Sequence, residues 1–244
     1  MNSNPNLLGT LYLVATPIGN LGDMTYRAVE ILKTVDVIAA EDTRTSKRLL
    51  DHYGVGPKRM VSYFGPKEHQ RAETLLHVLL EGKNVALITD AGTPGISDPA
   101  VKVVRRAIAH GITVIPVPGA SALLAGLSGS GLDTSSFTFE GFLPIKSGRR
   151  LNALNRLAAE PRTVVLFEST HRIAKLLDEL EQIMPERLIV VARELTKIHE
   201  EFLRGIPTEI KASIKGARLK GEMVVIIPSS DSHALELQKD AEDD

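Results

Sequence analysis

The segment from Ile88 to Pro99 reads Ile-Thr-Asp-Ala-Gly-Thr-Pro-Gly-Ile-Ser-Asp-Pro, and the prediction of the fold starts from it. The four apolar residues from Val85 to Ile88 have the length and β-branching of an interior parallel strand. The loop after them contains two glycines and a proline, and open α/β sheets bind small ligands at such strand ends. This loop lacks the lysine of a P-loop and the three-glycine spacing of a dinucleotide fingerprint. We therefore expect a ligand that is not held through a pyrophosphate.

A helix is predicted directly after this loop. Asp98 is a typical N-cap residue, and the proline that follows it suits the first helical position. The buried face would be formed by Val101, Val104 and Ile108, and the helix would end at Gly111.

Three further strands of the first half are predicted to end in unusual loops. Together with the first loop, the segments are Thr16–Asn20, Glu41–Arg44, Thr89–Pro99 and Pro118–Ser121. Strand and helix patterns alternate, which indicates a parallel sheet with right-handed crossovers. All four loops would then open on the same edge and line one cleft, which favours a small-molecule enzyme over a structural protein.

The composition is that of an ordinary soluble globular protein, with 43% hydrophobic and 24% charged residues among 244. No cysteine occurs, which excludes disulfides and thiolate chemistry and fits a reducing cytoplasm. The first eight residues carry no signal-peptide pattern and no apolar run is long enough to span a membrane, so we expect a cytoplasmic protein. The histidines lack metal-ligand spacing, and no metal is expected.

Two domains and a tail are predicted: residues 1–119, residues 120–228, and a disordered acidic tail over residues 229–244. The tail contains six acidic residues and one basic residue. The rest of the chain has 28 basic and 24 acidic residues. This mild excess permits an anionic partner but is far from the strongly basic balance of a dedicated nucleic-acid-binding protein.

Polar segments also follow two predicted strands of the second half, at Glu168–Arg172 and Arg193–Lys197. The first contains serine, histidine and glutamate, but neighbours along one turn cannot adopt the geometry of a hydrolase triad, and no nucleophile elbow occurs. His171 is more typical of a cap or packing residue than of a base.

Two groups of charged residues have both a structural and a functional interpretation. Glu41 and Asp42 beside Arg44 are either an ion-paired helix start or a catalytic or substrate-orienting group. The segment from Gly141 to Ala159 contains four basic residues and no acidic one. These four, Lys146, Arg149, Arg150 and Arg156, form either a solvated helix face or a positive field suited to phosphate oxygens.

Seven motifs together resemble a known family. They are Ala15–Leu21 (ATPIGNL), Ala40–Arg44 (AEDTR), Thr89–Pro94 (TDAGTP), Glu140–Pro144 (EGFLP), Phe167–Arg172 (FESTHR), Ala192–Lys197 (ARELTK) and Gly221–Val224 (GEMV). The set is similar to the tetrapyrrole methylase-like group of S-adenosylmethionine-dependent methyltransferases. Within that group it resembles the bacterial enzymes that methylate the ribose 2′-oxygen of a cytidine in the decoding centre of small-subunit (16S) rRNA. The resemblance extends in order from Leu8 to Pro228.

This resemblance implies an α/β fold of two αβα domains with mostly parallel sheets, S-adenosyl-L-methionine in the cleft between the domains, and a homodimer. The implied cofactor-binding residues are Pro17, Ile18, Gly92, Thr93, Pro94, Gly95, Gly119, Ala120, Ser121, Phe167, Ala192, Leu195 and Met223. A cofactor without phosphates needs backbone groups and apolar walls, which agrees with the absence of a P-loop.

For methyl transfer to a ribose hydroxyl, a base or proton acceptor is also needed, because the hydroxyl is a poor nucleophile until its proton can leave. The candidates are Glu41, Asp42 and Lys197. The residues expected to contact RNA are Arg44, Lys146, Arg149 and Arg150. Two alternatives remain open at this point: methylation of a tetrapyrrole by the same scaffold, and a non-catalytic binder in ribosome assembly.

The chain departs from the family pattern in two places. Phe64–Glu68 stands where many members carry a stretch with histidine and asparagine, and an acidic tail stands where longer members continue into a helical extension. Both departures concern contacts to RNA.

Overall fold

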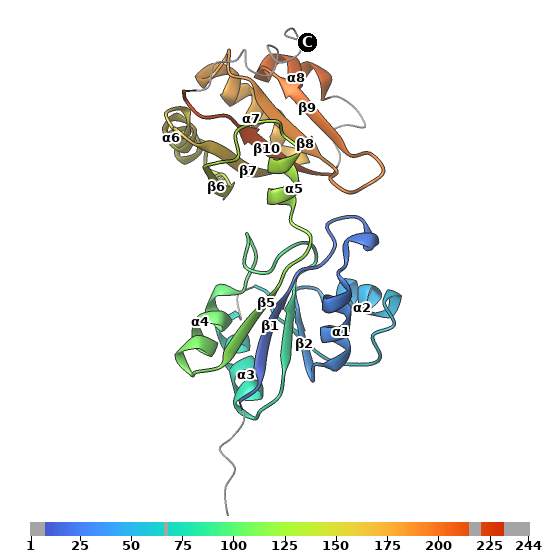
Figure 1. Ribbon diagram of the computed structural model, residues 1–244. Helices are drawn as coiled ribbons and strands as arrows, with labels where there is room; N and C mark the ends of the chain where they lie inside the picture. Colours follow the sequence, from blue (N-terminus) through green and yellow to red (C-terminus); the bar gives the residue numbers. More distant parts are fainter. Residues whose placement is uncertain (1–7, 66–67, 215–220, 232–244) are drawn as a thin grey trace, which may run out of the picture. The chain divides into compact units, whose positions relative to one another are not determined.

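The computed structural model describes residues 8–65, 68–214 and 221–231 (Figure 1). The chain divides into two compact units between Ser121 and Ala122. The predicted domain limits remain a prediction. Most of the predicted acidic tail, from residue 232 onward, lies outside the described residues, as do residues 66 and 67 of the departing segment.

The first unit contains a five-stranded sheet in the order β3-β2-β4-β1-β5, in which every neighbouring pair is parallel. Its strands are β1 (Thr10–Val14), β2 (Val37–Ala40), β3 (Arg59–Ser62), β4 (Val85–Ile88) and β5 (Thr113–Val117). Its helices are η1 (Leu21–Asp23), α1 (Tyr26–Thr34), α2 (Thr43–His52), α3 (Glu68–Leu80) and α4 (Val101–Ala109). The predicted parallel sheet is confirmed in this unit.

The strands β2 and β4 of the first sheet are buried on both faces, as expected of parallel strands between helices. In β2, Val37 and Ala39 pack with α3 and α4, whereas Ile38 and Ala40 pack with α1 and α2. Side chains alternate between the faces of a strand, so four consecutive apolar residues serve two separate cores. Figure 1 shows α1 and α2 on one side of this sheet and α3 and α4 on the other.

The helix after the central loop differs from the prediction. The cap residue of α4 is Ala100, whose side chain makes no capping hydrogen bond, and Asp98 lies in the loop before it. The buried face consists of Val103 and Ala107. The predicted face was wrong at Val101 and Ile108, which are 50% and 63% exposed, because apolar residues occur on two sides of this helix; Val104 is partly buried against the core.

The second unit has a mixed sheet in the order β6-β7-β10-β8-β9. Its strands are β6 (Phe137–Phe142), β7 (Thr163–Ser169), β8 (Ile189–Arg193), β9 (Glu201–Gly205) and β10 (Glu222–Ile227), and its helices are α5 (Ala122–Ser128), α6 (Ser147–Ala158), α7 (Thr170–Ile183) and α8 (Pro207–Ser213). Only β6 and β7 pair in parallel; β10 is antiparallel to both of its neighbours, and β8 is antiparallel to β9.

The mixed sheet of the second unit differs from the mostly parallel sheet that was expected. Part of this difference arises because the sequence did not predict β9. A short loop without a helix joins β8 to β9, and two strands joined in this way pair antiparallel. Helices α6, α7 and α8 bury one face of the sheet, while α5 contacts β7 and β10. Over both units most strand pairs are parallel, and the predicted α/β class is confirmed.

One predicted RNA contact is wrong. Arg150 lies on the buried side of α6, where its Nε and Nη2 atoms each donate to the Glu179 carboxylate of α7 at 2.6 Å. Both side chains are more than nine-tenths buried. Helical periodicity turned this arginine inward although its basic neighbours are exposed, and RNA cannot reach it.

We predict that Arg150→Met lowers the free energy of unfolding by about 3–5 kcal/mol, because it leaves the Glu179 carboxylate buried without a partner. The double variant R150M/E179M should lose much less. The matched control is Arg162→Met, which removes an exposed ion pair with Glu160 in the same unit and should change stability little. Urea denaturation measures all three, and equal losses for Arg150→Met and Arg162→Met would contradict the prediction.

Candidate functional site

The loops after β1 and β4 are joined at the carboxyl edge of the first sheet. Thr16 and Gly92 form an isolated bridge, with N–H to C=O distances of 2.9 and 3.0 Å. The Thr16 hydroxyl, which is buried, donates to the carbonyl oxygen of Thr89 at 3.1 Å. These contacts fix the two loops against each other.

The loop after β5 is hydrogen-bonded to the loop after β4. The hydroxyl of Thr93 donates to the carbonyl oxygen of Ala120 at 3.2 Å. A Cβ atom at Gly119 would lie 2.9 Å from the Cβ of Ala15, and one at Gly92 would lie 3.4 Å from the Ile18 side chain. The glycines therefore allow backbone and side chains to approach more closely than other residues would. Segments containing nine of the predicted cofactor-binding residues thus meet at one edge.

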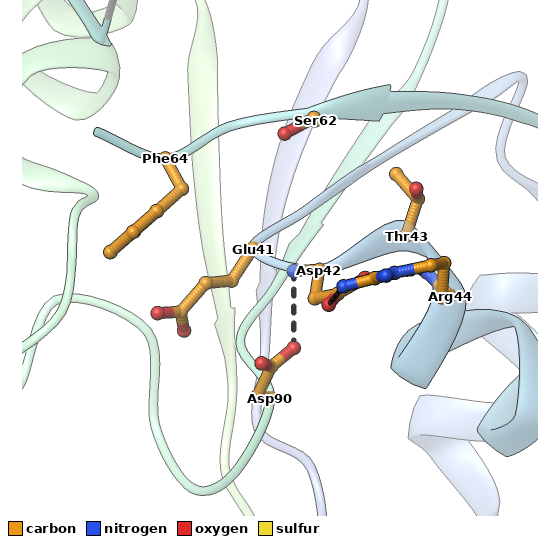
Figure 2. Close-up of a pocket in the computed structure, with 7 residues that line it drawn as sticks. All are labelled: Glu41, Asp42, Thr43, Arg44, Ser62, Phe64 and Asp90. Atoms are coloured by element: carbon orange, nitrogen blue, oxygen red, sulfur yellow. Dashed lines mark hydrogen bonds and ion pairs between the residues drawn. The ribbon is translucent and has the colours of Figure 1, made fainter. Parts of the chain in front are cut away.

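A shallow pocket of 380 Å³ lies beside these loops, at the ends of β2 and β3 (Figure 2). It is lined by Glu41, Asp42, Thr43, Arg44, Ser62, Phe64 and Asp90. The backbone N–H of Asp42 donates to the Asp90 carboxylate at 3.1 Å, which joins the β2 loop to the central loop. In Figure 2 the Glu41 carboxylate points away from Arg44.

The carboxylates at this edge have different acidities. Burial raises the pKa of Glu41, and the negative charge of Asp90 raises it further. Burial, with repulsion from Glu41 and Asp90, raises the pKa of Asp98 to about 6. The side-chain hydrogen bond from Arg44 lowers the pKa of Asp42 to about 2. Burial and nearby negative charge therefore raise the pKa of both Glu41 and Asp98, whereas Asp42 is an ionised N-cap of α2.

Sequence reasoning missed Asp98 because it was interpreted as a helix cap. Pro99 and Ala100 lie between Asp98 and α4, and Ala100 occupies the N-cap position, so the Asp98 carboxylate does not cap the helix. The available signal was that Asp98 lies in a strand-end loop, as the acidic residues Glu41, Asp42 and Asp90 do.

In the second unit, the predicted catalytic residue Lys197 is paired with two carboxylates. Its Nζ atom lies 3.0 Å from Glu194 Oε1 and 3.3 Å from Glu222 Oε2. Burial opposes the charge of Lys197, but these contacts outweigh burial and raise its pKa. A lysine whose protonated form is stabilised in this way is poorly suited to act as a base.

Three of the four predicted cofactor-binding residues of this unit lie on neighbouring strands, and the fourth, Leu195, lies in the loop after β8. Phe167 on β7 and Ala192 on β8 are both register partners of Val224 on β10, next to Met223. The Phe167 ring is in edge-to-face contact with Phe142, at a centroid distance of 5.8 Å. The structure thus groups the predicted cofactor-binding residues into one set in each unit.

Three of the residues expected to contact RNA are exposed. The side chain of Arg44 is 89% exposed while it pairs with Asp42. Lys146 and Arg149 are exposed at the beginning of α6, whose N-terminus has no side-chain cap. Within the described residues, no helix is long and apolar enough to cross a membrane, and no group of three or more histidine or acidic side chains is arranged to hold a metal ion.

Comparison with protein families matches residues 10–210 to the Tetrapyrrole (Corrin/Porphyrin) Methylases. The chain is 50% identical over 221 residues to "Ribosomal RNA small subunit methyltransferase I" of Synechocystis sp., which covers 90% of this chain and 79% of that protein. It is 46% identical over 243 residues to the protein of the same name from Escherichia coli O157:H7, covering 98% of this chain and 84% of the relative.

Solved structures show the same fold at low identity. A diphthine synthase superposes with a TM-score of 0.73 at 17% identity, over 96% of this chain and 95% of that one. Uroporphyrin-III C-methyl transferase from Thermus thermophilus, crystallised with S-adenosyl homocysteine, has a TM-score of 0.62 at 22% identity, over 89% and 97% of the two chains.

Proposed function

The chain belongs to the tetrapyrrole methylase family, and from this membership we propose that it transfers a methyl group from S-adenosyl-L-methionine to the ribose 2′-oxygen of a cytidine in the decoding centre of 16S rRNA. The observation that carries this function is the 46–50% identity to small-subunit rRNA methyltransferases over most of both chains. The chain is thus an enzyme, an S-adenosylmethionine-dependent methyltransferase.

The strand-end loops of the first unit fit this cofactor. Close approaches at Gly92 and Gly119 leave backbone groups and small side chains at the edge, with no lysine or glycine-rich cradle for a phosphate. When bound, the sulfonium supplies an electrophilic methyl group. The chain must orient the acceptor oxygen toward this methyl group. Such orientation can lower the activation barrier by about 7–11 kcal/mol.

The acceptor hydroxyl must also lose its proton. Glu41 and Asp98 are the groups best suited to take it, because burial raises the pKa of both carboxyl groups, that of Asp98 to about 6. Asp42 and Lys197 are less suited, since their ion pairs stabilise the charged forms. Asp42 instead holds Arg44, which we assign to a phosphate of the RNA.

The proposal also covers partners and location. Lys146 and Arg149 contact the RNA backbone, the enzyme forms a homodimer, and it acts in the cytoplasm on small ribosomal subunits. The exposed apolar residues Val101 and Ile108 of α4 are compatible with a subunit contact. Size-exclusion chromatography with light scattering measures the oligomeric state.

Mass-spectrometric mapping of ribose methylation in 16S rRNA tests the function directly. Small subunits from a strain lacking this gene should miss one cytidine 2′-O-methyl group and regain it when incubated with the enzyme and S-adenosyl-L-methionine. Calorimetry should show that the enzyme binds the donor. Donor binding with no methylation of subunits, but with methylation of a corrinoid precursor, would favour a tetrapyrrole methyltransferase. No donor binding would favour a non-catalytic binder.

The pH dependence of kcat should identify the base. A carboxylate base works only when ionised, so log kcat should rise with pH through a pKa near 6 and then level off. Of Glu41→Gln and Asp98→Asn, the variant that removes the base should lower kcat by about two to four orders of magnitude. If Asp98 is the base, Glu41→Gln should move the rise to lower pH, because the charge of Glu41 helps to raise the pKa of Asp98. Donor binding is checked separately, and unchanged profiles in both variants would remove this assignment.

Charge reversal tests the RNA surface. The variant K146E/R149E should raise KM for small subunits by about tenfold or more and weaken the salt dependence, because fewer phosphates are neutralised. The control is the double variant R27E/K33E at two exposed residues of α1 in the other unit, which changes the net charge by the same amount. A similar KM for the two variants would contradict a role of Lys146 and Arg149 in RNA binding.

A further inference from the structure

The loop after β8 contains two non-glycine residues with left-handed backbone. Glu194 has a φ of 51° and Thr196 a φ of 67°, and among the described residues Ser97 alone shares this feature outside glycine. Such conformations are costly for residues with a side chain and persist where the surroundings enforce them. Two of them in one four-residue segment call for a physical cause.

That cause is the Glu194–Lys197–Glu222 cluster. Oε1 of Glu194 accepts hydrogen bonds from Lys197 Nζ at 3.0 Å and from the backbone N–H of Glu222 at 3.2 Å. The backbone N–H of Glu194 donates to the Glu222 carbonyl at 3.1 Å, and that of Lys197 donates to the Glu194 carbonyl at 3.0 Å. One carboxylate therefore ties the turn to itself and to the first residue of β10.

Gly221 completes this arrangement. Its φ is 91°, and a Cβ atom at this position would lie 1.7 Å from Glu194 Oε1. A side chain there would displace the carboxylate. The glycine before β10 is therefore needed both for its backbone conformation and for the space that Glu194 occupies.

The result is a fixed path for the segment between Ala192 and Leu195. Ala192 is fully buried at the end of β8, and the left-handed turn at Glu194 directs Leu195 inward, where it is 7% exposed. Both residues belong to the predicted cofactor-binding set. The register between β8 and β10 ends at Arg193 and is followed by the hydrogen bond from the Glu194 N–H to the Glu222 carbonyl, so the cluster supports the shape of the segment at this point.

We propose that Glu194 is a positioning residue, which together with Lys197 and Gly221 holds the Ala192–Leu195 backbone in the conformation that binds S-adenosyl-L-methionine. This inference rests on the proposed function. It assigns Lys197 to the positioning of this segment and not to proton transfer.

Calorimetric titration of the full chain with S-adenosyl-L-methionine tests the proposal. Glu194→Ala should raise the donor Kd about tenfold or more, because small displacements of a binding segment are costly. Glu194→Gln should stay within about threefold of the original enzyme, since its amide oxygen still accepts both hydrogen bonds. The control is Glu181→Ala, which removes a carboxylate from Lys211, another lysine of this unit that contacts two acidic side chains.

A second variant keeps the test valid if Glu194→Ala folds poorly. Gly221→Ala should weaken donor binding as well, and the losses in Gly221→Ala and Glu194→Ala should be less than additive in the double variant, because both remove the same contact. Amide hydrogen exchange over residues 193–197 should become faster in each variant, while the helices α6 and α7 keep their protection.

The outcomes separate this proposal from the proposed function. If the unmodified enzyme fails to bind the donor, the proposed function is wrong. If it binds the donor and Glu194→Ala binds it equally well, the positioning role is wrong. An increased Kd without faster exchange in the segment would also overturn the role, since the effect would then not act through its backbone.

Discussion

Parallel pairing of the five strands in the first unit is the constraint on which the rest of the structure depends. Parallel strands need crossover connections, so every strand of this sheet ends at the same edge. Loops separated by up to about a hundred residues therefore become neighbours, as the bridge between Thr16 and Gly92 and the hydrogen bond from Thr93 to Ala120 demonstrate. The site is a consequence of strand direction, and its chemistry comes from the residues that the loops carry.

Carboxylates gathered at this edge acquire separate roles through their surroundings. Asp42 pairs with Arg44 and stays ionised, whereas Glu41 and Asp98 are partly buried near Asp90 and hold their protons more tightly. Carboxylates thus supply both an N-cap with a bound arginine and two groups with raised pKa values, that of Asp98 being about 6. Burial of these carboxyl groups, with repulsion between like charges added to it, raises their pKa values and makes proton acceptance feasible.

The second unit uses charge differently. Arg150 and Glu179 are buried as a bidentate pair between two helices, and the Glu194 carboxylate enforces a left-handed turn. Arg150 and Glu179 are 29 residues apart in the sequence, and Glu194 and Glu222 are 28 residues apart, so neither arrangement follows from local sequence. A basic segment on a helix has an exposed and a buried side, and only the packing of α6 against α7 decides which side Arg150 occupies.

The sequence by itself determined the α/β class, nearly all strands and helices, and the common edge of the four loops, because short apolar runs and glycine- or proline-containing turns are local signals. It did not determine the buried face of α4, where Val101 and Val103 were equally apolar candidates. It also missed β9 and the antiparallel pairs of the second sheet. The pairing of Asp42 with Arg44 is local, and the sequence offered it as one of two interpretations. Only the tertiary structure decided the raised pKa values of Glu41 and Asp98, because burial and charges from other loops set them.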